Sequence, residues 1–191
     1  MAGYKKKWLG EVIAYTLAGS VASASVGAVV GWLGGLLWPG QVSRLGILVA
    51  LAVGLIAIAR EVGWLSFPLP ELRRQTEGVW AKLFSGTVAA TLWGFDLGLV
   101  FTARLTFSGV WLLVAVAMLV GEPAFGSALF VLYWLGRALS VWIAPLLMPD
   151  ADATPWVLDV IYRHYRLFQR IHVLGLVWST VVLIVWLSKG T

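Results

Sequence analysis

Apolar residues fill most of the chain in long stretches that contain no charged side chain. The longest of these stretches covers residues 12–43, and the last covers residues 171–188. A helix needs about 20 mostly apolar residues to cross the hydrocarbon layer of a membrane. Joining stretches that only a single charge interrupts predicts helices at about 11–38, 44–62, 83–121, 126–148 and 169–188. The pattern therefore predicts an all-α bundle of transmembrane helices, with residues 1–191 forming one transmembrane domain.

The segment 83–121 is too long for one straight crossing. At the helical rise of 1.5 Å per residue it would be about 58 Å long, roughly twice the hydrocarbon thickness. It is either one broken crossing, which gives five crossings in all, or a hairpin turning near Arg104, which gives six. Cytoplasmic loops carry an excess of Lys and Arg, and five crossings place the clusters at 5–7, 73–74 and 163–170 on one side. We therefore favour five crossings with a cytoplasmic N-terminus.

Residues 155–168 predict an amphipathic helix lying on the membrane surface. Thr154 and Pro155 are typical of the N-cap and first position of a helix. Arg163, Arg166 and Arg170 follow at helical spacing. Anionic lipid headgroups would neutralise these arginines, and a protein partner is the alternative.

Composition supports a lipid environment. The chain is 60% hydrophobic and 12% charged, whereas soluble domains carry roughly 25% charged residues. Its 12 Trp residues suit the membrane interface. The net charge of +5 lies in runs beside apolar stretches, so membrane orientation explains it better than nucleic acid does. Lys5–Lys7 resemble the start of a secretory signal, but the apolar run that follows is too long for one, so we expect a retained first helix in the membrane.

Small residues recur at every fourth position of the first predicted helix. They are Gly19, Ser23, Gly27, Gly31 and Gly35. Such spacing forms a groove into which the backbone of another helix can pack closely. We expect the groove to pack within this chain, and a homodimer interface or a membrane protein partner is the alternative.

Three ionisable residues fall inside predicted crossings: Asp96, Arg104 and Arg137. Such groups are costly in a bilayer, so they face protein or water and are candidates for function. Asp96 and Arg137 lie at similar depths and are able to pair. Together with Thr102, they suggest a midplane substrate-binding site, whereas a purely structural ion pair is the competing interpretation.

Other chemistry finds little support in the sequence. The chain has no Cys, which excludes disulfides and thiolate metal sites within it. His164 and His172 lack further ligands at the spacing of a metal site. No nucleophile elbow or phosphate loop occurs. We therefore expect no metal, no cofactor and no enzymatic activity.

Three segments together resemble a known family. They are Phe-Pro-Leu-Pro-Glu-Leu-Arg-Arg-Gln at 67–75, Gly-Phe-Asp-Leu-Gly-Leu-Val-Phe-Thr at 94–102 and Tyr-Trp-Leu-Gly-Arg at 133–137. Over residues 67–188 the chain resembles the CcdA/DsbD-type transmembrane region and the superfamily it shares with LysE-like exporters. The resemblance implies a broken helix lining a central cavity. The redox members use paired cysteines, which this chain lacks, so no thiol chemistry carries over.

These observations favour a transporter-like protein that moves a small solute or ion. A non-catalytic subunit or assembly factor of a larger membrane complex is the main alternative. An enzyme acting on lipid is a more distant one, because no acid–base or nucleophilic constellation is visible.

Overall fold

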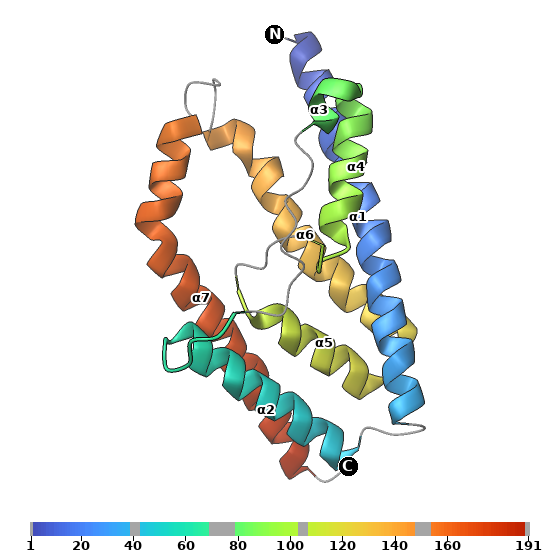
Figure 1. Ribbon diagram of the computed structural model, residues 1–191, viewed down its shortest axis with the longest axis vertical. Helices are drawn as coiled ribbons and strands as arrows, with labels where there is room; N and C mark the ends of the chain where they lie inside the picture. Colours follow the sequence, from blue (N-terminus) through green and yellow to red (C-terminus); the bar gives the residue numbers. More distant parts are fainter. Residues whose placement is uncertain (1, 39–42, 69–78, 103–106, 148–153, 190–191) are drawn as a thin grey trace.

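The structure, a computed structural model, describes residues 2–38, 43–68, 79–102, 107–147 and 154–189 (Figure 1). This part of the chain is helical and contains no strand. The helices are α1 (Ala2–Leu37), α2 (Arg44–Glu61), α3 (Trp80–Leu83), α4 (Gly86–Gly98), α5 (Gly109–Val120), α6 (Pro123–Leu147) and α7 (Thr154–Ser188).

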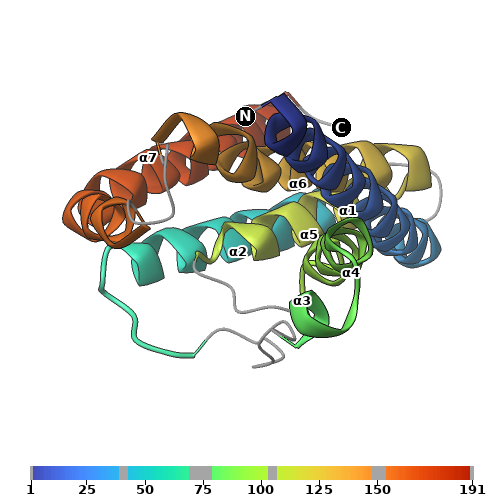
Figure 2. The ribbon, with the colours of Figure 1, turned by 90° about the horizontal axis from the view of Figure 1, so that it is seen from above.

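The helices form two groups that share α5. Helix α1 packs along α4 and α6, while α2 packs against α7 and α5. Figure 2 shows α2 and α7 on the side of the molecule away from α1 and α4. Helix α5 joins the groups because its opposite faces belong to two apolar clusters. Leu112 and Leu119 pack with α2 and α7, whereas Val110 and Ala117 pack with Phe130 of α6.

Within the described residues, three helices are long and apolar enough to cross a membrane. The candidate spans are Lys7–Leu37, Pro123–Ile143 and Arg163–Ser188. Helix α2 has 18 residues but carries Arg44, Arg60 and Glu61 at its ends. Helix α5 is a shorter apolar helix. These spans support an all-α membrane protein, without fixing how many times it crosses. Large apolar side chains such as Trp178, 72% exposed, face outward.

Residues 83–121 do not form one helix. They are divided among the end of α3, α4 and α5, and Val100, just after α4, has a φ of 65°. This left-handed conformation, rare for a β-branched residue, lies outside the right-handed helical region. The helix therefore ends before Val100. In Figure 1 both α4 and α5 progress away from the end that holds the N-terminus.

Several predicted boundaries need correction. A separate surface helix at 155–168 is wrong, because α7 runs unbroken from Thr154 to Ser188 and has no Gly or Pro between Pro155 and Gly175. Helix α6 begins at Pro123 rather than 126, since proline fits the first position of a helix. Gly121, with a φ of 69°, closes α5 in the left-handed conformation that favours glycine.

Candidate functional site

The stripe of small residues on α1 is occupied by helices of the same chain. A Cβ atom added at Gly31 would lie 2.5 Å from the main-chain oxygen of Glu122. One at Gly35 would lie 2.6 Å from the main-chain oxygen of Gly121, and one at Gly27 would overlap the backbone of Gly126. The groove therefore receives the end of α5 and the start of α6, and these positions offer no open face to a second copy.

The N-terminal part of the same stripe receives α4 and a tryptophan of α6. The Ser23 hydroxyl, fully buried, donates a hydrogen bond of 2.7 Å to the main-chain oxygen of Gly98. A Cβ at Gly19 would overlap the Trp134 ring, and the indole N–H of Trp134 donates to the main-chain oxygen of Thr16 at 2.9 Å. Close packing and these bonds fix α1 against both neighbours.

Asp96 and Arg137 do not form the ion pair that their depth suggests. Among the described residues an ion pair joins Arg60 and Glu61, but none joins Asp96 and Arg137. Gly94 and Gly98 of α4 face α1, and Asp96, two residues from each, points to the opposite side of the helix. Arg137 lies on α6, which packs on α1. Asp96 is therefore turned away from α1, the helix on which α6 packs.

Asp96 and Arg137 are nonetheless unusual. Asp96 is buried, and its Oδ2 atom has no hydrogen-bond partner within the described structure. The buried Nη1 atom of Arg137 likewise has none, although its guanidinium lies 5.9 Å from the Tyr133 ring centre, within reach of a cation–π interaction.

Of the other two predicted site residues, the structure describes Thr102 alone. The Thr102 hydroxyl donates a hydrogen bond to the main-chain oxygen of Asp96, so it closes the end of α4. Arg104 lies outside the described residues. The substrate-binding group predicted from sequence therefore stays a prediction.

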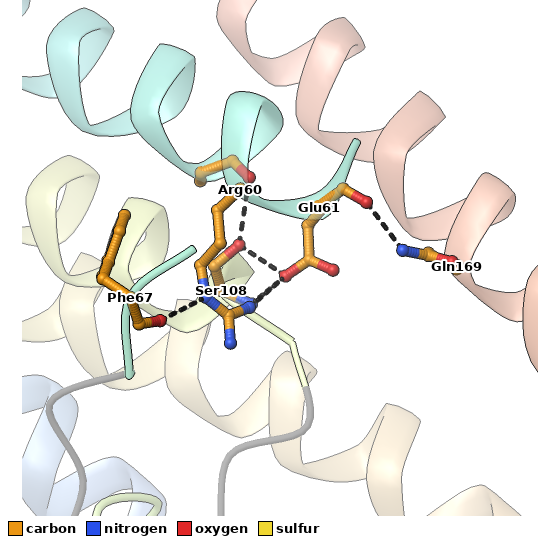
Figure 3. Close-up of polar contacts among 6 residues, drawn as sticks. Arg60, Glu61, Phe67, Ser108 and Gln169 are labelled. Atoms are coloured by element: carbon orange, nitrogen blue, oxygen red, sulfur yellow. Dashed lines mark hydrogen bonds and ion pairs between the residues drawn. The ribbon is translucent and has the colours of Figure 1, made fainter. Parts of the chain in front are cut away.

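The best-connected polar group joins three helices at a different place. Glu61, the last residue of α2, has a side chain only 3% exposed (Figure 3). Its Oε1 atom accepts the main-chain N–H of Ser108 at 2.8 Å and lies 2.7 Å from the Ser108 hydroxyl. That hydroxyl also lies 3.2 Å from the main-chain oxygen of Ala57, but the carboxylate is the stronger acceptor. Glu61 thus closes the first turn of α5, as a capping-box glutamate does within one helix.

Two further contacts hold together this polar junction, where Glu61 and Ser108 join the end of α2 to the start of α5. Arg60 Nη1 lies 3.0 Å from Glu61 Oε1, and Arg60 Nε donates to the main-chain oxygen of Phe67 at 3.3 Å. The Gln169 amide of α7 donates to the main-chain oxygen of Glu61 at 2.6 Å (Figure 3). The buried carboxylate is therefore neutralised, and its helix end is attached to both α5 and α7.

Aromatic residues adjoin this junction. The Phe107 ring stacks on His172 at 4.7 Å and on Tyr165 at 6.1 Å. A Cβ at Gly109 would overlap the His172 ring, so glycine is required for α7 to approach the start of α5. His172 Nε2 is buried without a hydrogen-bond partner among the described residues.

The junction fits a structural role better than acid–base chemistry. Its carboxylate already accepts hydrogen bonds from Ser108 and is paired with Arg60. Within the described residues no group of three or more His, Asp or Glu side chains is placed to hold a metal ion.

Sequence reasoning missed Glu61 because the residue stands at the end of an apolar stretch, where a solvated charge is ordinary. A signal was nevertheless present. Ala50, Gly54, Ala57 and Glu61 recur at helical spacing and are all buried. Small residues leading to a carboxylate mark a closely packed face that carries the acid inward.

Comparison with known proteins gives one consistent name. The chain is 26% identical over 151 residues to the methylamine utilization protein MauF of Paracoccus versutus. The matched region covers 78% of this chain and 55% of that protein. It is 30% identical over 141 residues to MauF of Methylophilus methylotrophus, covering 70% and 48%. It is 30% identical over 139 residues to MauF of Methylorubrum extorquens, covering 72% and 48%.

No protein-family model matches the chain, and no solved structure matches it significantly. The chain spans about half the length of the curated relatives it matches.

These matches overturn two expectations. The proposed resemblance to CcdA/DsbD and LysE-like proteins is wrong, since the relatives are named MauF. That resemblance rested mainly on glycine and apolar positions, which close helix packing in any membrane protein favours. The transporter-like function is wrong as well, because the name of these relatives refers to methylamine utilization. The chain is thus similar, over most of its own length, to part of the MauF proteins.

Proposed function

We propose that this chain is a non-catalytic membrane protein of methylamine utilization that acts as a subunit or assembly factor through protein partners. The similarity to MauF proteins over 70–78% of the chain is the observation that carries this proposal. It also fits the alternative that the sequence left open beside a transporter-like protein, a non-catalytic subunit or assembly factor.

The polar interior supports an accessory role. Glu61 is committed to Arg60 and Ser108, and the Ser127 hydroxyl joins α6 to α1 through the main-chain oxygen of Ala24 at 2.9 Å. A cavity of about 480 Å³ between α2 and α5 is lined mainly by apolar residues such as Val49, Val53 and Val114. The polar groups at Glu61 and Ser127 hold helices together. A route for a polar solute would instead need polar groups that line an open path.

We further propose one transmembrane domain with five crossings and a cytoplasmic N-terminus. In Figure 1, α1, α4, α5 and α7 progress in one direction, whereas α2 and α6 run in the other. Helices α4 and α5 together would make the broken third crossing. Lys7 and Arg163 begin candidate spans, and Lys82 belongs to α3, which lies near the N-terminus in Figure 1. Arg44 begins α2 and Lys189 follows α7, at helix ends that lie near the C-terminus in Figure 1. This imbalance supports a cytoplasmic position for the first group.

Gentle detergent purification of the tagged chain from its native membrane, followed by mass spectrometry of the intact particle, tests the accessory role. We expect a defined complex in which at least one partner protein is present in stoichiometric amount. A particle that contains only this chain, as monomer or homodimer, would count against the proposal.

A further inference from the structure

A pocket of about 480 Å³ lies between the end of α2 and the middle of α7. Val62 follows α2 on one wall, and Arg166, Arg170 and Leu174 line the other wall on α7. Glu61 and Gln169 are part of the lining as well, and they are the residues that attach α2 to α5 and α7. The pocket is thus built on the polar junction and combines positive charge with apolar surface.

The two arginines of the pocket carry unneutralised charge. Arg166 and Arg170 are both exposed, and they lie four residues apart, on one face of α7. Neither forms an ion pair with another side chain in the described part of the chain. The acid of the pocket, Glu61, is already engaged by Arg60 and by Ser108. A bound anion would therefore meet two free guanidinium groups.

The position of the pocket along α7 selects a lipid as the source of that anion. Arg166 and Arg170 fall in the first two turns of the candidate span Arg163–Ser188, at the level where arginine side chains reach the headgroup region. The surface beyond them is apolar and outward-facing, with Leu174 68% and Trp178 72% exposed. A headgroup beside the arginines would have its acyl chains along this surface.

We propose that the pocket between α2 and α7 binds the phosphate of an anionic phospholipid. Arg166 and Arg170 bind the phosphate oxygens, because guanidinium groups form short charge-assisted hydrogen bonds to phosphate. Val62 and Leu174 contact the first part of the acyl chains. Basic pockets between membrane helices are a recurrent form of specific lipid recognition. This inference does not depend on methylamine utilization and requires only that the chain lies in a bilayer.

Lipid titration of the purified full chain, followed by native mass spectrometry, tests the site. The probe is phosphatidylglycerol, with phosphatidylcholine of the same acyl chains as the zwitterionic reference. In Arg166→Gln/Arg170→Gln we expect the dissociation constant for the first phosphatidylglycerol to rise roughly 30-fold, since each basic residue contributes about fivefold near a membrane surface. Arg44→Gln/Lys189→Gln removes the same charge at the other end of the bundle and should leave the constant unchanged.

A third variant separates loss of the site from misfolding. Arg166→Lys/Arg170→Lys keeps both charges, and because Lys and Arg contribute alike near a membrane surface, its dissociation constant should stay within about threefold of that of the unchanged chain. The proposal would be overturned if the Gln pair bound phosphatidylglycerol as tightly as the unchanged chain does. It would also be overturned if the unchanged chain bound phosphatidylcholine as tightly as phosphatidylglycerol. Full displacement of the lipid by millimolar inorganic phosphate would make it a site for a soluble anion. If the Gln pair lost a co-purifying acidic protein but still bound lipid, the pocket would be a protein interface instead of a lipid site.

Discussion

The Glu61 carboxylate lies 2.8 Å from the main-chain nitrogen and 2.7 Å from the hydroxyl of Ser108, and it thereby ties the end of α2 to the start of α5. Sequence separates the two residues by 47 positions. The contact neutralises a buried acid and satisfies an N–H group at a helix start, which has no partner within its own helix. One side chain thus links the last residue of α2 to the first N–H groups of α5.

Removal of this carboxylate should destabilise the bundle. Glu61→Ala leaves Arg60 and the buried Ser108 N–H without their partner, and we expect a loss of about 3 kcal/mol in the free energy of unfolding. Glu61→Gln keeps an acceptor and should lose less, about 1–2 kcal/mol. Denaturant unfolding in detergent measures both. Glu122→Gln alters an exposed acid and should stay within about 0.5 kcal/mol of the unchanged chain; a similar value for Glu61→Ala would contradict the proposed clamp.

Glycines of the α1 stripe should tolerate no side chain. Gly27→Ala places a methyl group against the main-chain oxygen of Gly126, so α1 and α6 must move apart. Overpacking of this kind lowers the free energy of unfolding by about 1–3 kcal/mol. Gly136→Ala and Gly175→Ala are matched controls, because a Cβ at either position meets nothing within 4 Å. These controls should be neutral or gain up to about 1 kcal/mol from helix propensity. Thermal unfolding distinguishes the two classes, and equal effects would refute the packing.

Asp96 and Arg137 should act independently. Since no ion pair joins them, the effects of Asp96→Asn and Arg137→Gln on unfolding free energy should add to within about 0.5 kcal/mol in the double variant. A double-mutant cycle measures the coupling directly. A coupling above about 1 kcal/mol would indicate the ion pair that their depth alone suggests.

Five crossings place the start of the last span and the C-terminal end on opposite sides of the membrane. The absence of native cysteines allows single cysteines to report this. Tyr165→Cys, at a 42% exposed position, should react with an impermeant maleimide only after the cells are opened. Lys189→Cys should react in intact cells. The reverse pattern, or labelling of both from one side, is incompatible with the proposed topology.

Sequence alone predicted the features that depend on local pattern. Long apolar runs located the helices, and their lack of polar surface indicated a membrane. The break within 83–121 was expected from length. The separate helix at 155–168 was not found, because the amphipathic pattern continues into α7 without a residue that ends a helix.

The features that failed depend on which faces of helices meet. Depth along the bundle placed Asp96 and Arg137 at one level, but only the rotation of α4, set by the contacts of Gly94 and Gly98 with α1, shows that they do not pair. Glu61 was missed for the same reason, since its burial follows from how α2 packs on α5 and α7. The resemblance to CcdA/DsbD failed because its matching positions report helix packing in general.

Growth of a strain that lacks this gene tests the central claim most directly. With methylamine as the growth substrate, we expect the deletion strain to fail to grow, and a plasmid copy of the gene to restore growth. Growth of the same strain on an unrelated substrate such as succinate should be unchanged. Undiminished growth on methylamine without the gene would contradict a role in methylamine utilization.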